Sequence, residues 1–73
     1  MSKFIKVFGN LINIDDIKRV RYEGDFYDRI FIIYYKDNTS IDMSNNRFRQ
    51  DSYEKGKEID KAYKELEEVL YRK

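Results

Sequence analysis

Cysteine and histidine are both absent from the 73-residue sequence, and their absence excludes several kinds of chemistry. A chain without cysteine has no disulfides, and a chain without either residue lacks the usual zinc ligands. A Ser-His or Cys-His nucleophile is excluded for the same reason. Cores of chains below about 70–80 residues seldom supply more than about 3–5 kcal/mol, so self-association remains as the means of stabilisation.

The sequence also has no excess of charge of either sign and no long apolar run. Lysine and arginine number 15 against 14 aspartate and glutamate, so the net charge of +1 creates no field that would attract nucleic acid or an anionic membrane. Residues 1–6 lack the apolar run of a secretory signal, and no segment approaches the roughly 20 apolar residues of a membrane span. We therefore expect a cytoplasmic protein with no membrane partner.

Motifs for catalysis are missing as well. Gly9, Gly24 and Gly56 are isolated from one another, so the sequence contains no glycine-rich phosphate loop. Asp15 and Asp16 are adjacent, and adjacent side chains on a strand point apart, so a turn is favoured over a shared carboxylate site. The sequence predicts a non-enzymatic protein with no catalytic residues, no cofactor and no metal site.

The chain does contain a series of short β-forming runs, separated by turn residues and followed by one amphipathic segment. Gly9-Asn10 and residues 37–39 are the strongest turn signals, and Asp15-Asp16 breaks the chain between two runs. The expected strands are residues 3–8, 11–14, 19–23, 29–36 and 40–44. Apolar positions at helical spacing then predict a helix with a buried stripe of Gly56, Ile59, Ala62, Tyr63, Leu66, Val69 and Leu70.

These elements predict an α+β fold in one domain, residues 1–73. We expect an antiparallel meander of four or five strands over about residues 3–44, with one C-terminal helix over about residues 52–72 packed on one face. The glycine on the helical stripe indicates that the helix approaches the sheet closely near its start.

Residues 30–35 are six consecutive apolar or aromatic residues, which carry the main functional prediction. Alternate side chains of a strand point to opposite faces, so both faces of the sheet are apolar there, and one helix covers only one of them. We expect the helix to cover the face of Val20, Tyr22, Ile41 and Met43. The open face then carries Arg19, Arg21, Ser40, Asp42 and one half of residues 30–35.

The open face predicts a protein interface that needs a covering partner, either a second copy of the chain or a host protein. Phe31, Ile33 and Tyr35 are expected to supply the buried contact, or Ile32 and Tyr34 in the other register, with Arg19 and Arg21 as the polar rim. Apolar and aromatic residues with arginine are typical of interface cores, so protein contact is favoured over nucleic acid.

A second candidate site lies just before the helix, where Arg47, Phe48 and Arg49 precede a helix N-terminus that would attract an anion. With Phe48 stacking on a base and the open sheet nearby, this pattern predicts a binder of nucleotides or single-stranded nucleic acid as the alternative function. In the competing structural interpretation, Phe48 packs under the helix and both arginines point to solvent. Asp51 favours that interpretation because it competes for the same backbone donors.

Two segments carry a resemblance to known proteins: Leu11-Ile12-Asn13-Ile14-Asp15-Asp16-Ile17 and Lys36-Asp37-Asn38. In both, the chain resembles small uncharacterised proteins of Gram-positive bacteria and their phages, in which a β-meander precedes a C-terminal helix. There an Ile-Asn-hydrophobic-Asp-x-Ile stretch leads into the sheet, and a Lys-Asp-Asn/Gly turn closes the last hairpin. The resemblance implies the fold and oligomerisation and assigns no functional residue. Because small phage proteins often inhibit a host defence or regulatory protein, it also implies such an inhibitor.

Overall fold

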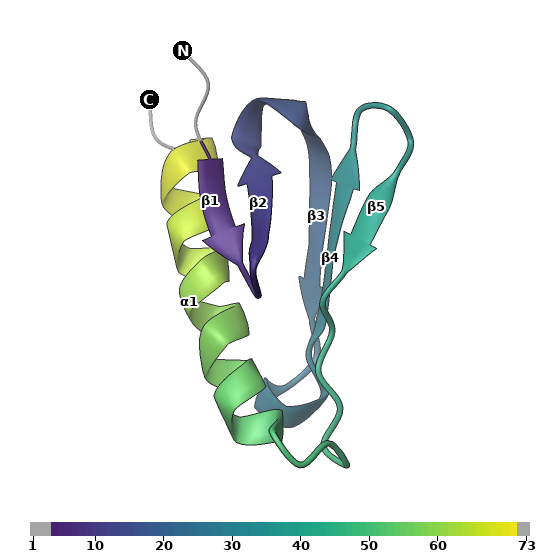
Figure 1. Cartoon of the computed structure of the whole chain (residues 1–73), viewed down its shortest axis with the longest axis vertical. Helices are drawn as coiled ribbons and strands as arrows, with labels where there is room; N and C mark the ends of the chain where they lie inside the picture. Colours follow the sequence, from purple (N-terminus) through teal and green to yellow (C-terminus); the bar gives the residue numbers. More distant parts are fainter. Residues whose placement is uncertain (1–3, 72–73) are drawn as a thin grey trace.

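The computed structural model describes residues 4–71, in which five strands are followed by one α-helix (Figure 1). The elements are β1 (Phe4–Val7), β2 (Asn10–Asn13), β3 (Ile17–Glu23), β4 (Ile30–Tyr35), β5 (Ser40–Asp42) and α1 (Ser52–Tyr71), with short 3-10 helices η1 (Ile14–Asp16) and η2 (Phe26–Asp28). The predicted α+β fold with antiparallel strands and a C-terminal helix is confirmed. Lys3 and Arg72, which the predicted first strand and helix included, lie outside the described residues.

The strands form two separate sheets. β1 and β2 make an antiparallel hairpin, and β3, β4 and β5 make an antiparallel meander with β4 in the centre. The break falls at η1, where the Asn13 side chain accepts a hydrogen bond from the Asp15 backbone N–H at 3.0 Å. This local bond turns the chain away from the hairpin before β3 begins, so the single meander expected over about residues 3–44 is divided at Asp15-Asp16.

The first turn is one residue earlier than the sequence predicts. Val7 pairs with Asn10, so Phe8 and Gly9 form the two-residue turn in place of Gly9-Asn10. Both residues have positive φ, +50° and +81°, as a two-residue hairpin turn of this hand requires. Glycine adopts this conformation without steric cost, whereas Phe8 is held in it while its ring packs against the core.

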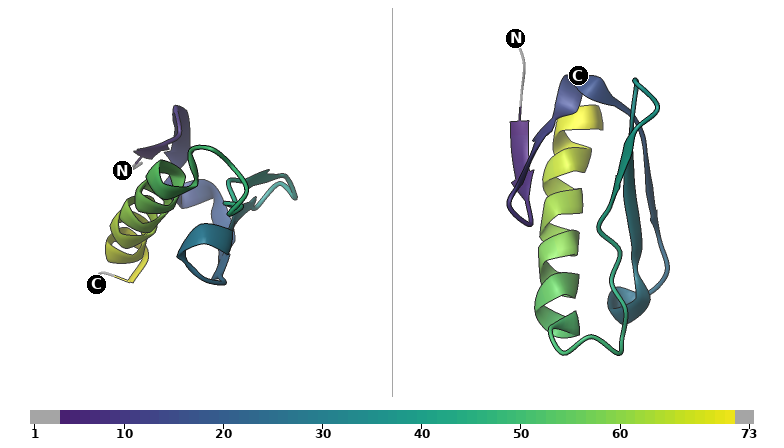
Figure 2. Two further views of the ribbon diagram at one scale, coloured as in Figure 1. Left: turned by 90° about the horizontal axis from the view of Figure 1, so that it is seen from below. Right: turned by 45° about the vertical axis from the view of Figure 1, so that its right-hand side comes forward.

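The core lies where α1 meets both sheets. Figure 2 shows the helix and the hairpin on one side of the three-stranded sheet, with no described element on the other side. The side chains that are most deeply buried come from every layer: Val7, Ile12, Phe31, Ile33, Ile59 and Leu66. Leu70, which the sequence predicts at the end of the buried helical stripe, lies at the rim of the core, and its side chain is 39% exposed.

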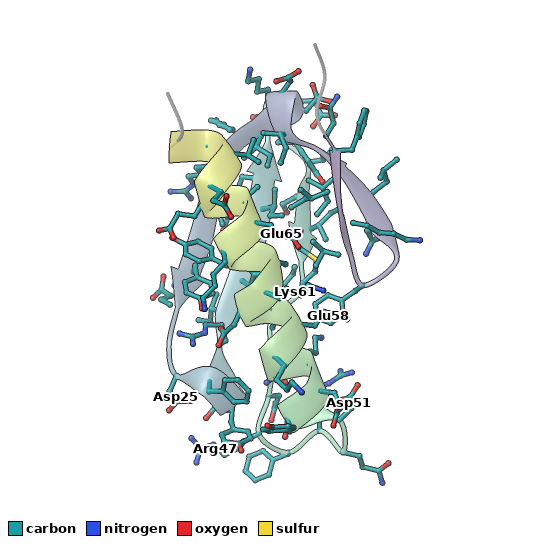
Figure 3. The ribbon with its side chains drawn as sticks, turned by 90° about the vertical axis from the view of Figure 1, so that its left-hand side faces the viewer. Asp25, Arg47, Asp51, Glu58, Lys61 and Glu65 are labelled. Atoms are coloured by element: carbon teal, nitrogen blue, oxygen red, sulfur yellow. The ribbon has the colours of Figure 1, made fainter. Side chains whose placement is uncertain are left out.

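Gly56 permits the close approach that the sequence predicts, although its neighbour is a loop residue. A Cβ at this position would lie 2.7 Å from ring atoms of Phe26 in η2, so the helix contacts η2 here and not a strand. The outer face of α1 is charged, as shown by the exposed side chains Glu58, Lys61 and Glu65 (Figure 3). The described helix is not apolar enough over a sufficient length to cross a membrane.

Candidate functional site

The candidate site is the open face of the three-stranded sheet, defined here as the outward face of β3, β4 and β5. Residues that pair across neighbouring antiparallel strands point to the same face, so the strand register defines its composition. One row consists of Arg19, Tyr34 and Ser40, and the next consists of Arg21, Ile32 and Asp42. Glu23 and Ile30 are paired one level further along.

The centre of the open face is apolar, and its β3 side is basic. Ile30, Ile32 and Tyr34 are partly buried, and they project from the central strand with side chains of both neighbouring strands beside them. The guanidinium carbon of Arg19 lies 4.5 Å from the centre of the Tyr34 ring, a cation–π contact. Arg21 pairs with Glu23 on the same strand, and this contact raises the pKa of the arginine.

The strand register corrects part of the predicted interface. Phe31 and Ile33 are fully buried at 0% exposure, and Tyr35 packs partly buried against the same core. The cause is the pairing of Val20 with Ile33 and of Tyr22 with Phe31, which places these side chains on the face that α1 covers. The alternative register, with Ile32 and Tyr34 outward, is the one that the structure adopts.

Arg19 and Arg21, by contrast, lie where the sequence predicts. Both are exposed on the open face, in register with Tyr34 and Ile32. Ser40 and Asp42 of β5 are exposed on the same face, opposite the arginines across the central strand. The open face therefore has a basic edge on β3, an apolar centre on β4 and an acidic residue on β5.

The loop between β5 and α1 pairs both of the predicted arginines with carboxylates. The Arg47 side chain pairs with Asp28 and lies 3.6 Å from an Asp25 carboxylate oxygen, and its backbone N–H donates to Asp28 at 3.1 Å. Arg49 binds Asp51 through two nitrogens, at 2.8 and 3.2 Å. The backbone N–H of Arg47, followed by its side chain, lowers the pKa of Asp28, and the Arg49 side chain lowers the pKa of Asp51. Figure 3 shows Arg47 and Asp25 together near the start of α1.

Phe48, between these arginines, does not pack under the helix. Its side chain is 89% exposed, and its backbone N–H donates to Asn46 Oδ1 at 2.8 Å. The loop is fixed from inside by Asn45, a buried residue whose side-chain nitrogen donates to the carbonyls of Phe26 and Ser52. Asn45 was not predicted as important, because a buried asparagine and an exposed one look alike in a polar segment.

A polar cluster joins α1 to the inner face of the sheet. The Tyr22 hydroxyl donates to Asp60 at 2.6 Å, and a guanidinium nitrogen of Arg29 lies 3.3 Å from the same carboxylate oxygen. The Tyr22 ring stacks on Tyr63 with centroids 3.7 Å apart. The guanidinium carbon of Arg29 lies 4.5 Å from the centre of the Tyr22 ring, a cation–π contact. Burial, followed by the bond to Asp60, raises the pKa of Tyr22 to about 12. The cluster joins residues that are distant in the chain, so no local pattern predicts it.

We expect the stability of the fold to fall in strong alkali because of Tyr22. Its pKa of about 12 in the folded chain exceeds the ordinary 10.0, so the folded state favours the neutral hydroxyl. This contribution is complete below about pH 10 and is lost as the pH rises through about 12. After allowance for partial exposure, the loss is about 1–2 kcal/mol.

Denaturant unfolding of the wild type and Tyr22→Phe, measured from about pH 9 to about pH 11.5, tests this expectation. The variant keeps the other six tyrosines and lacks the titrating hydroxyl, so its free energy of unfolding should fall less steeply with pH. Parallel pH dependences of the two proteins would contradict the assignment to Tyr22.

Comparison with known proteins provides no family for this fold and site. No protein family matches the chain, and neither the curated proteins nor the solved structures gave a match. In the part of the chain that the structure describes, no three aspartate or glutamate side chains are grouped so that they could hold a metal ion.

Proposed function

We propose that this chain is a non-enzymatic binding protein that acts through protein–protein contact at the open face. The observation that carries the proposal is the row Ile30, Ile32 and Tyr34, which lies on the central strand with no described element over it (Figure 2). Apolar and aromatic side chains bordered by arginine are typical of the buried centre of protein interfaces. Arg19 and Arg21 supply that border.

The size of the chain supports a partner as well. A sequence of 73 residues without cysteine relies on a small core, and a partner that covers the apolar row adds buried area to it. The partner is a second copy of the chain, a host protein, or both in turn. The resemblance to small phage proteins supports a finer class, an inhibitor that occupies the surface of a host defence or regulatory protein.

Nucleotide or single-stranded nucleic-acid binding has less support from the structure. Arg47 and Arg49 each face a carboxylate. A phosphate would have to compete with these carboxylates for each guanidinium. The two functions differ in their response to salt, because phosphate contacts weaken steeply as salt rises and an apolar interface changes little.

Two matched lysine variants test the proposed function. Ile32→Lys places a charge in the centre of the open face, whereas Leu11→Lys makes a similar change on the hairpin, where the leucine is 67% exposed. The purified protein that binds the chain, a second copy included, should lose about tenfold or more in affinity for Ile32→Lys and bind Leu11→Lys like the wild type. Isothermal titration or sedimentation measures these affinities, and circular dichroism checks that both variants fold.

Equal affinities for the two lysine variants would contradict the proposal, since the open face would then not be the contact. A titration with a single-stranded oligonucleotide serves as the second arm. Binding that disappears at high salt and is abolished by Arg47→Ala would support the alternative function in place of protein contact.

A further inference from the structure

We propose that the open face binds a second copy of this chain, with a two-fold axis that runs along β4 and passes at Ile32. The inference rests on the proposed function and adds the identity of the partner and the orientation of the two subunits. Charge complementarity carries it, because the open face has opposite charges on its two sides.

The decisive feature is the row Arg21, Ile32 and Asp42. These residues pair across β3, β4 and β5, so a cation, an apolar side chain and an anion lie side by side, about 4.8 Å apart from strand to strand. Both hydrogen bonds that Asp42 accepts from Ser44 use Oδ1. Oδ2 of the carboxylate can therefore accept from a guanidinium that approaches over the open face.

Two identical sheets stack face to face about a two-fold axis in either of two main orientations. An axis along the strands exchanges the two sides of the sheet, so β3 of one subunit lies over β5 of the other. Arg21 then faces Asp42 of the partner subunit, and this contact occurs twice. Glu23 binds Arg21 through Nε, so the terminal nitrogens of the guanidinium are the donors that face Asp42 of the partner subunit. An axis across the strands places β3 over β3, so Arg21 faces Arg21 of the partner subunit, which is unfavourable. The charges thus select the axis along β4.

The remaining residues of the open face agree with this orientation. In the row of Arg19, Tyr34 and Ser40, Arg19 lies over Ser40 of the partner subunit, which brings no like charges together. In the row of Arg21 and Asp42, Ile32 lies at the axis and contacts Ile32 of the partner subunit. Packed sheets are rotated by about 30° relative to each other, which displaces side chains one strand from the axis by about 2.4 Å. An arginine side chain accommodates that displacement, so the Arg21–Asp42 contacts survive the rotation.

The size of the open face sets the strength of the dimer. Six residues of β4 span about 20 Å, and three strands span about 14 Å. The area of the open face, about 280 Å², is small beside the roughly 800 Å² that each partner buries in a standard interface. We therefore expect a dimer that dissociates in the micromolar range. Sedimentation equilibrium of the full chain from low micromolar to millimolar concentration measures it.

Charge exchange between positions 21 and 42 tests the orientation. Each of the variants Arg21→Asp and Asp42→Arg brings like charges face to face at both contacts. The dimerisation affinity of each variant alone should therefore be lower than that of the wild type by about tenfold or more. The double variant Arg21→Asp/Asp42→Arg should recover most of the wild-type affinity. An equimolar mixture of the two single variants should form a heterodimer, which also shows that both are folded.

Specific outcomes overturn the inference. Single variants that dimerise like the wild type would exclude the axis along β4, and so would an equimolar mixture that does not associate although circular dichroism shows that both single variants are folded. A wild type that stays monomeric throughout the concentration range would exclude the second copy as partner. The proposed function would survive that result if Ile32→Lys still lost affinity for a different purified protein, whereas it would fail with the inference if that protein bound Ile32→Lys normally.

Discussion

Replacing Phe31 with alanine is expected to lower the free energy of unfolding by about 3–5 kcal/mol. Phe31 is fully buried in the centre of the core, and its ring meets Tyr22 and Tyr63 edge to face, with centroids 6.0 and 6.4 Å away. Truncation removes this buried area and leaves a cavity that the surrounding sheets fill only in part. Because a core of this size supplies only about 3–5 kcal/mol in total, the variant should be largely unfolded at room temperature.

Ile32→Ala is the matched control for Phe31→Ala, since Ile32 is the next residue of the same strand and points to the open face. We expect it to cost about 1 kcal/mol or less in a subunit that is alone, because its side chain is only partly buried. Urea unfolding followed by circular dichroism at low protein concentration keeps dimer formation out of the comparison. Equal losses in the two variants would mean that the described register of β4 is wrong.

Asn45→Ala is expected to cost about 2–3 kcal/mol, although the change removes only a small polar side chain. The Asn45 amide nitrogen lies 3.1 Å from the Phe26 carbonyl and 2.9 Å from the Ser52 carbonyl, so one residue joins η2 to the start of α1. Asn45 is only 7% exposed, and truncation leaves carbonyls without their donor in a partly buried site. The loop that carries Phe48 should also lose its fixed shape.

Two neighbouring variants separate the role of Asn45 from a general effect on the loop. Asn45→Asp keeps the acceptor for the Asn46 N–H, but it replaces the amide donor with a carboxylate oxygen that faces two carbonyl oxygens. It should therefore be at least as destabilising as Asn45→Ala at neutral pH. Asn46→Ala, at an exposed position, should cost less than about 1 kcal/mol. Thermal unfolding measures all three, and a tolerated Asn45→Asp would show that the amide donor is not what holds the loop.

Local patterns predicted most of the fold. The alternation of Arg19, Val20, Arg21 and Tyr22 placed the correct side chains on each face of β3, because adjacent positions differ sharply in polarity. The helical spacing from Gly56 to Leu66 predicted the buried side of α1 for the same reason. Each of these patterns lies within a single strand or helix, so it can be recognised in the sequence without knowledge of the tertiary contacts.

Residues 30–35 show where the same reasoning stops. All six are apolar or aromatic, so the pattern contains no information on which half faces α1. The register is settled by the pairing with β3, and that pairing depends on the connection through Gly24 and η2. Gly24 has a φ of +89°, and the Asp25 carboxylate accepts from the Asp28 N–H at 3.1 Å. The path of such an irregular loop cannot be computed from turn propensities alone.

The contacts that fix the candidate sites are distant in sequence. Arg47 and Asp28 are 19 residues apart, as are Asn45 and Phe26, and Tyr22 and Asp60 are 38 residues apart. No spacing rule relates such pairs, so the anion site predicted for Arg47 could not take account of Asp28, whereas Asp51 is only two residues from Arg49. The division of the strands into two sheets was equally hidden, since a short break between strands is compatible with one sheet or two.

Because the described strands are divided into two sheets, the β1–β2 hairpin is not hydrogen-bonded to the three-stranded sheet. Among the described residues, no backbone hydrogen bond connects β1 or β2 to β3, so Ile5, Val7 and Ile12 hold the hairpin in place by side-chain packing. Opening of the hairpin alone would break no strand ladder and would leave β3, β4 and β5 paired, at the cost of exposing Val7 and Ile12. In that open form, proteases and chaperones would bind the chain at its N-terminal hairpin.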